Sequence, residues 1–204
     1  FMNSALLKIN GGLVIVVADD PGMHSSQGEQ DSRFFADFAK VPCFEPTNQQ
    51  EAYEMTREAF DLSEKWKVPV LIRMVTRLAH SRAVIKPWDK IRPQNPVHKT
   101  EETRGWRLLP AIAQKLWIDL LETNKEFASY SEGTAFNKLT INPDYKKVGI
   151  ITTGLGKNYF EENLADMGVK PSRLHIGFYP APVEKIRKLA ESVDKILIIE
   201  EGYP

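Results

Sequence analysis

A short, unbroken apolar run that ends in two acids constrains the fold more than any other part of this sequence. Residues 11–20 read GGLVIVVADD, and the apolar run stops at residue 18. A strand this uniformly apolar is typical of a parallel sheet that helices cover on both faces. The run therefore predicts an α/β protein, with Asp19 and Asp20 just beyond the carboxyl end of a strand.

Helical patterns alternate with further strands along the first part of the chain. Residues 28–40 are one helix candidate, with three phenylalanines on or near one face, and residues 47–67 are the clearest candidate. In this second helix Thr47 and Gln50 match a capping-box pattern. A second buried strand, VPVLIRMVT, follows at residues 68–76.

The patterning divides the chain into three parts. Residues 1–85 have the strand–helix alternation of an α/β unit. Residues 86–146 are read as a linker or extended crossover, with one amphipathic helix near residues 108–124 and loop elsewhere. Residues 147–204 return to the α/β pattern with two helices and three strands, one of which is expected over residues 172–180.

Composition and cysteine usage exclude several classes of protein. Lys plus Arg total 27, as do Asp plus Glu, so there is no overall basic field for nucleic acid or a membrane surface. The apolar runs are too short to span a bilayer. The single Cys43 cannot form an internal disulfide or a cysteine-ligated cluster by itself, which favours a cytoplasmic setting. Because the sequence opens FMNSALLKIN, without Met at position 1, we expect a fragment of a longer protein.

The polar stretch after the first strand is the main candidate site. In an open parallel sheet, ligands bind beyond the carboxyl ends of the strands. The stretch ADDPGMHSSQGEQDSR places donors and acceptors of every kind at that edge. The alternative is a polar loop that caps the next helix, with Asp19 or Asp20 paired to an arginine.

Two other segments carry charged or glycine-rich patterns. RMVTRLAHSR, at residues 73–82, could bind a carboxylate or phosphate, but neutralising Asp19 and Asp20 is the favoured interpretation. TTGLGKNYFEEN leads from a strand into a helix N-terminus and departs from both the P-loop and the G-x-G-x-x-G patterns, so a tight turn is favoured. His175 and Cys43 are interpreted as structural residues.

The sequence resembles a known enzyme family. GGLVIVVADDPGMHSSQGEQDSR, with PCFEPTNQQEAYEMTREAFDLSEKWKVPVLIRMVTRLAHSR after it, closely resembles α subunits of indolepyruvate:ferredoxin oxidoreductases. These belong to the thiamine-diphosphate-dependent 2-oxoacid:ferredoxin oxidoreductases. Residues 147–204 resemble the domain that follows in these enzymes. The resemblance implies the later part of a pyrimidine-binding domain, then a transketolase-C-terminal-like α/β domain.

The resemblance also implies a reaction and its participants. The family oxidatively decarboxylates indolepyruvate or another aryl 2-oxoacid to the acyl-CoA, with ferredoxin as electron acceptor. The full enzyme uses thiamine diphosphate, Mg²⁺ and [4Fe-4S] clusters. The family's activating glutamate, its Gly-Asp-Gly motif and its cysteine clusters are missing from this sequence. We therefore expect no cofactor to be held by this chain alone, no turnover without the rest of the enzyme, and assembly with a β subunit in an oligomer.

The resemblance places the substrate at the polar loop. The residues expected to line the 2-oxoacid pocket are His24, Ser25, Ser26 and Gln27, with Thr76, Arg77 and His80 as second candidates. Two alternatives remain open at this stage. One is a non-catalytic assembly domain, and the other is an oxidoreductase for a different 2-oxoacid.

Overall fold

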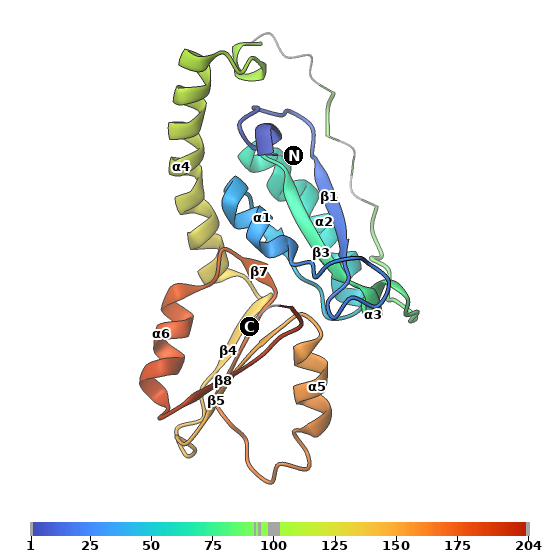
Figure 1. Cartoon of the computed structure of the whole chain (residues 1–204), viewed down its shortest axis with the longest axis vertical. Helices are drawn as coiled ribbons and strands as arrows, with labels where there is room; N and C mark the ends of the chain where they lie inside the picture. The colour runs from blue at the N-terminus through green and yellow to red at the C-terminus, as the bar shows by residue number, and fades with distance from the viewer. Residues whose placement is uncertain (1, 92, 94, 98–102, 203–204) are drawn as a thin grey trace.

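The computed structural model describes residues 2–91, 93, 95–97 and 103–202, and it holds two four-stranded sheets (Figure 1). The first, sheet A, has the strand order β1-β3-β2-β7, where β7 is Phe178–Tyr179. Its first three strands are parallel, and β7 runs antiparallel to β2. The elements that build this half are β1 (Val14–Asp19), α1 (Ser32–Ala39), β2 (Cys43–Phe44), α2 (Gln49–Trp66), β3 (Val70–Val75) and the short helices η1 (Met2–Ala5) and α3 (Thr76–Ala79).

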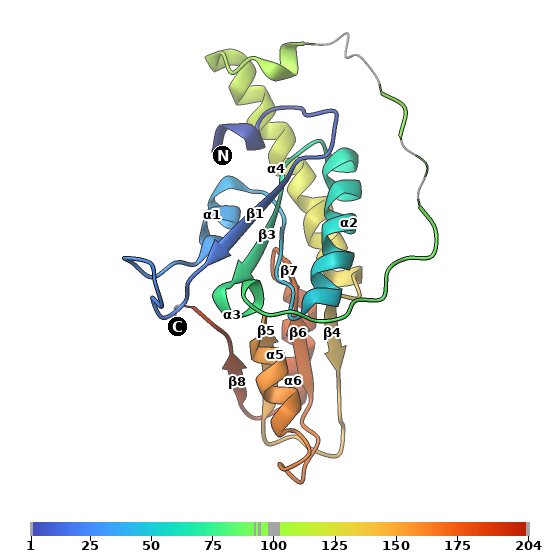
Figure 2. The ribbon, with the colours of Figure 1, turned by 90° about the vertical axis from the view of Figure 1, so that its right-hand side faces the viewer.

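Helices α1 and α2 lie on opposite sides of sheet A (Figure 2). The strand β3 between them is buried at all but one of its six positions, as the continuous apolar pattern predicted. Helix α2 turns Met55, Ala59, Leu62 and Trp66 into the core, which confirms the helical spacing seen in the sequence. The three phenylalanines of α1, in contrast, face outward, and its buried residues are small.

The N-terminus of α2 is capped one residue later than the sequence pattern indicated. The N-cap is Asn48, whose side chain accepts a hydrogen bond from the Glu51 backbone N–H at 2.9 Å. The Glu51 carboxylate in turn accepts from the Thr47 backbone N–H and hydroxyl. The predicted Thr47–Gln50 pair is wrong, because Asn48 takes the N-cap position and Glu51, not Gln50, accepts from the backbone before it.

The loop expected over residues 128–145 was also wrong, because these residues include the end of a helix and a strand. Helix α4 (Pro110–Gly133) runs on, since Phe127 is fully buried and packs on the Trp66 ring at a centroid distance of 4.6 Å. The chain then forms strand β4 (Asn137–Thr140), which pairs antiparallel with β6 (Arg173–Ile176). Tertiary packing therefore overrides the loop-forming Ser, Gly and Thr residues that the sequence shows here. The short helix η2 (Arg104–Trp106) precedes α4.

Sheet B is the second sheet, with the strand order β4-β6-β5-β8. Strand β6 is parallel to β5, which is parallel to β8. Helices α5 and α6 lie on opposite sides of it (Figure 1). The elements not yet given are β5 (Gly149–Thr153), α5 (Gly156–Asn163), α6 (Val183–Ser192) and β8 (Ile196–Ile199).

The strand expected over residues 172–180 is two strands in two sheets. β6 ends at Ile176, and β7 (Phe178–Tyr179) pairs with β2 of sheet A. The fully buried Asn137 holds the break, because its side-chain oxygen accepts from the Gly177 and Phe178 backbone N–H groups, each at 2.9 Å. The two halves of the chain are therefore joined by a segment that gives one strand to each sheet, and the predicted division at residues 85 and 146 does not separate the sheets.

The two faces of sheet B differ in chemistry. Leu174, Ile176 and Ile151 point to one face and form a cluster with Leu189 of α6. Strand alternation places their neighbours on the opposite face, where α5 lies. The polar residues of this second face, the polar face, are Lys138, Thr140, Thr152, Arg173 and His175. Ile150 lies on the same face, opposite Arg173 in the pairing register.

His175 is the buried member of the polar face. Its side chain is 9% exposed, and its Nδ1 lies 3.1 Å from the carbonyl oxygen of Thr152. Burial, with the nearby Lys157 ammonium, lowers the pKa of His175 to about 4. The imidazole is therefore uncharged at neutral pH. The Thr152 hydroxyl also lies 3.1 Å from Nδ1, and we assign the ring proton to Nδ1 because the carbonyl beside it can only accept.

Acid should destabilise the fold through His175. Between pH 6.5 and 4 the unfolded chain binds a proton at this residue that the folded chain does not bind, so stability falls as the pH falls. The expected loss is up to about 3 kcal/mol. Urea unfolding of the wild type and of His175→Gln across this range measures it. His80→Gln, at an exposed histidine, is the control, and equal acid sensitivity in wild type and His175→Gln would contradict the prediction.

Candidate functional site

The polar loop after β1 is organised by one carboxylate. Asp20 accepts hydrogen bonds from the Ser25 and Ser26 backbone N–H groups at 2.7 and 2.8 Å, and from the Thr76 hydroxyl at 2.6 Å. The Thr76 hydroxyl, followed by the two loop amides, holds the pKa of Asp20 well below its usual range. Asp20 thus fixes the loop to the carboxyl ends of β1 and β3, the edge where the sequence predicted a site.

Asp19 has a different partner. Its carboxylate accepts from the Arg73 Nε at 2.6 Å and from the Ser32 backbone N–H at 2.7 Å. Arg73 is fully buried and also pairs with Glu45. This confirms the interpretation that Arg73 neutralises an acid of the neighbouring strand. For Asp20 that interpretation was wrong, because hydroxyl and amide donors satisfy it instead.

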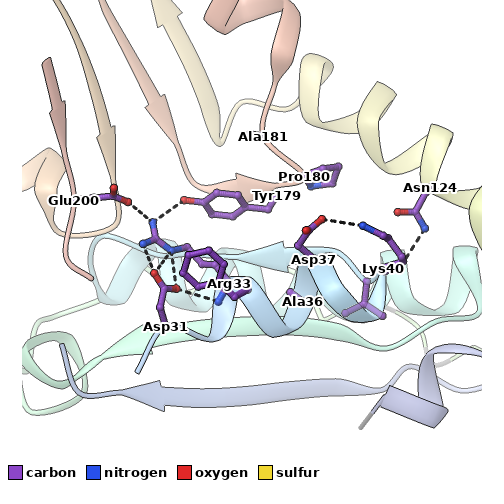
Figure 3. Close-up of a pocket in the computed structure, with 12 residues that line it drawn as sticks. Asp31, Arg33, Ala36, Asp37, Lys40, Asn124, Tyr179, Pro180, Ala181 and Glu200 are labelled. Carbon is purple, nitrogen blue, oxygen red and sulfur yellow. Dashed lines mark hydrogen bonds and ion pairs between the residues drawn. The ribbon is translucent and has the colours of Figure 1, made fainter. Parts of the chain in front are cut away.

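A second arginine extends the buried charges toward the other half of the chain. Arg33 donates from Nε to Asp31 at 2.8 Å and from Nη1 to Glu200 at 2.7 Å (Figure 3). The Tyr179 hydroxyl lies 3.3 Å from the same Nη1 and donates to Glu45 at 2.9 Å. Two guanidinium groups therefore connect acids of both halves in one network, and Asp31 also caps α1.

The TTGLGKN segment is part of the same junction. A Cβ at Gly154 would lie 2.7 Å from the Glu45 carboxylate, and one at Gly156 would lie 2.3 Å from a backbone oxygen of β8. Lys157 pairs with Glu51 at 2.7 Å, and the Asn158 side chain donates to the Thr47 carbonyl. The segment is a tight turn packed against sheet A and α2, as the favoured interpretation held.

The structure brings the predicted site residues together only in part. Ser25 and Ser26 are tied to Thr76 through Asp20, and the Ser26 hydroxyl donates to the Gly28 carbonyl. Arg77 turns away toward α5 and pairs with Glu201 at 3.2 Å. The side chains of His24, Gln27 and His80 are exposed and have no partner within the described residues.

Sequence reasoning missed the residues of the junction that come from outside the first strand and its loop. These are Asp31, Arg33, Glu45, Tyr179 and Glu200. The only available signal was the Asp-Ser-Arg sequence at the start of α1, where an N-cap acid precedes an arginine by two positions. The contribution of Tyr179 depends on β7 joining sheet A, which no local pattern indicated.

A groove of about 420 Å³ opens beside this network (Figure 3). It runs along α1 toward α4, between α1 and the segment that follows β7, and Arg33, Lys40, Asn124 and Pro180 are among its lining residues. The Arg33 guanidinium is already paired with two acids, and Lys40 pairs with Asp37 at 3.2 Å. None of the seven predicted site residues lines it, so the groove is separate from the polar loop.

The acids and the cysteine of the described residues are not arranged as a metal or cluster site. Within the described residues no three His, Cys, Asp or Glu side chains are grouped to hold a metal ion. The acids at the junction are neutralised by Arg33 and Arg73. Cys43 is fully buried, and burial raises the pKa of its thiol, so it is unsuited to bind a cluster. In the same part of the chain, no helix has the length and apolar character needed to cross a membrane.

Known proteins match the chain along its whole length, although no family model does. Indolepyruvate oxidoreductase subunit IorA of Thermococcus kodakarensis is 38% identical over 216 positions that cover 100% of this chain. The subunit of Methanothermobacter thermautotrophicus is 31% identical, again over 100% of this chain. The chain is related to IorA. It spans about a third of the relatives' length, 32% and 33% in these two cases.

A solved structure has a similar fold. The 2-oxoglutarate:ferredoxin oxidoreductase from Magnetococcus marinus, determined with 2-oxoglutarate, coenzyme A and succinyl-CoA bound, superposes with a TM-score of 0.66. The match covers 96% of this chain and 42% of that chain, at 16% identity. It confirms the predicted α/β fold class, in which parallel strands dominate both sheets.

Removing the Arg73 guanidinium should destabilise the chain strongly. Arg73→Met would leave Asp19 buried without a cation and Glu45 with only Arg33, at 3.8 Å, at an expected cost of about 3–5 kcal/mol. Arg77→Met, at a side chain that is 56% exposed, is the matched control and should change little. Urea unfolding followed by circular dichroism at pH 7 compares the two, and equal midpoints would contradict the prediction.

Proposed function

We propose that the chain is the part of a 2-oxoacid:ferredoxin oxidoreductase that contributes the substrate-side loop. The observation that carries the proposal is the relation to IorA along the entire chain. The whole enzyme would oxidatively decarboxylate indolepyruvate or another aryl 2-oxoacid to the acyl-CoA and pass electrons to ferredoxin. An oxidoreductase for a different 2-oxoacid is the nearest alternative, because the described residues do not form a pocket that sets substrate size.

The loop has the properties that a substrate-binding segment needs. It lies at the carboxyl edge of a parallel sheet, and its backbone is fixed by Asp20 before any ligand arrives. His24 and Gln27 are exposed and free to donate hydrogen bonds to a carboxylate or a carbonyl oxygen. We assign these two residues, with Ser25 and Ser26, to the 2-oxoacid pocket, and Thr76, Arg77 and His80 to its margin.

The remaining parts of the reaction belong to other segments in this proposal. Thiamine diphosphate would supply the carbanion chemistry, and Mg²⁺ and the [4Fe-4S] clusters would be held outside this chain. A β subunit and ferredoxin are the proposed protein partners, in a cytoplasmic oligomer. The role of this chain is to position the substrate and to join the two sheets around the buried network.

An assay of the whole enzyme tests the proposal. The full-length protein with its partner subunit should reduce ferredoxin only when a 2-oxoacid and CoA are both present, and it should bind thiamine diphosphate in a calorimetric titration. The 204-residue chain alone should do neither. Comparing kcat/KM for indolepyruvate, pyruvate and 2-oxoglutarate identifies the substrate. Turnover or cofactor binding by the chain alone would contradict the proposal that other segments hold the cofactors. No turnover of the whole enzyme with any 2-oxoacid would contradict the proposed activity.

Variants of the loop test the site within the whole enzyme. His24→Ala and Gln27→Ala should each lower kcat/KM about ten-fold, the effect of losing one hydrogen bond to a charged substrate. Gln30→Ala, in the same loop and equally exposed, is the matched control and should behave as wild type. Wild-type kinetics for both His24→Ala and Gln27→Ala would remove these residues from the pocket.

One observation favours an assembly role as a second function. Phe34, Phe35 and Phe38 on α1 are 63%, 57% and 73% exposed. Three neighbouring phenylalanines on one helix are unusual at a free surface and are typical of an interface. We infer that another segment of the same subunit covers them, because the relatives are about three times as long as this chain. If loop variants alter assembly and leave kinetics intact, assembly is the main role.

A further inference from the structure

A second cavity lies away from the polar loop, over the polar face of sheet B. It has a volume of about 300 Å³ and is bounded by the sheet, by α5 and by the first turns of α2. Its lining residues include the polar-face set, acids of both helices and two aromatic side chains. None of the seven predicted substrate residues lines it, so an inference about this cavity does not depend on the proposed function.

The floor of the cavity is unusual for an α/β sheet. A sheet covered by helices on both faces normally buries apolar side chains on each face. Here α6 covers such a face, but the face toward α5 presents Lys138, Arg173 and His175 beside the buried Ile150. The unpaired Nε2 of His175 is buried, and since Nδ1 donates to the Thr152 carbonyl, Nε2 is a hydrogen-bond acceptor. A buried acceptor without a hydrogen-bond partner that lines a cavity is expected to accept from a bound ligand or water.

Four of the charged residues around the cavity have no ion-pair partner among the described residues. Lys138 and Arg173 of the floor have no ion-pair partner among the described residues. Neither do Glu54 of α2 and Glu161 of α5, although Glu54 accepts a hydrogen bond from the Gln50 amide. The other two charged residues, Lys157 and Glu51, form an ion pair with each other at 2.7 Å. Two free cations on one wall and two free acids on the others match a ligand with both signs of charge.

We propose that this cavity binds a small zwitterion, an α-amino acid with an apolar side chain. Its carboxylate would pair with Arg173 and Lys138, and its ammonium would donate to Glu54, Glu161 and the Nε2 of His175. Phe136 and Phe160, which also line the cavity, supply an apolar wall for the side chain. Because α2 belongs to the half built on sheet A, the ligand would bridge the two halves of the chain.

Thermal unfolding of the full-length protein tests the proposal with three probes of one shape. L-Leucine carries both charged groups, 4-methylpentanoate lacks the ammonium, and isopentylamine lacks the carboxylate. At constant ionic strength and pH 7.5, leucine should raise the melting temperature in a saturable way, and the two analogues should not. No saturable shift with leucine, or a shift of equal size with either analogue, would overturn the proposal.

Charge variants give a second test, in which each variant either weakens or strengthens leucine binding. Arg173→Gln and Glu54→Gln should each weaken leucine binding at least ten-fold, because a zwitterion needs both walls. Lys188→Gln, at an exposed lysine on α6, should leave binding unchanged. If Arg173→Gln does not fold, the exposed Lys138→Gln replaces it. Weaker binding in Arg173→Gln with tighter binding in Glu54→Gln would indicate a simple anion site and contradict the zwitterion.

Discussion

The buried Arg73 is the interaction on which the rest of the structure depends. Its guanidinium lies in the middle of sheet A and pairs with Asp19 on β1 and with Glu45 just after β2, while Nη2 donates to the Glu201 carbonyl at 3.0 Å. An arginine in a core is costly unless each donor is satisfied, and here acids and a carbonyl from three segments satisfy it. The same contacts fix where β1 ends, where β2 lies beside β3, and where the end of sheet B approaches sheet A.

The division of the chain into two halves is consequently less sharp than its sequence pattern. Strand β7 leaves one sheet for the other, Asn137 holds that break, and the α5 N-terminus docks on the α2 N-terminus. Each contact joins residues far apart in the sequence, and each is polar. Polar contacts of this kind need defined geometry, so they set the relative position of the two sheets more specifically than apolar packing alone would.

The sequence was informative where a local pattern decides the structure. The unbroken apolar run predicted β1, the spacing from Met55 to Trp66 predicted the buried stripe of α2, and the position of Asp20 predicted a polar edge. It failed where a distant partner decides. Phe127 keeps α4 helical because Trp66 is there to receive it, and Tyr179 enters the buried network only because β7 pairs with β2. The resemblance in residues 11–82 named the family, but it could not supply these contacts.

The candidate loop shows how a segment can be ordered and still remain free to bind. Asp20 accepts hydrogen bonds from two backbone amides of the loop and from the Thr76 hydroxyl at the start of α3. These bonds set the backbone path of the loop and leave most of its side chains exposed. A loop held in this way loses little conformational entropy when a ligand arrives, because the ordering has already occurred on folding. The exposed side chains of His24 and Gln27 keep their hydrogen-bonding capacity for the substrate that we propose. The two acids at the end of β1 therefore have separate roles. Asp19 pairs with the buried Arg73, and Asp20 fixes the backbone of the loop.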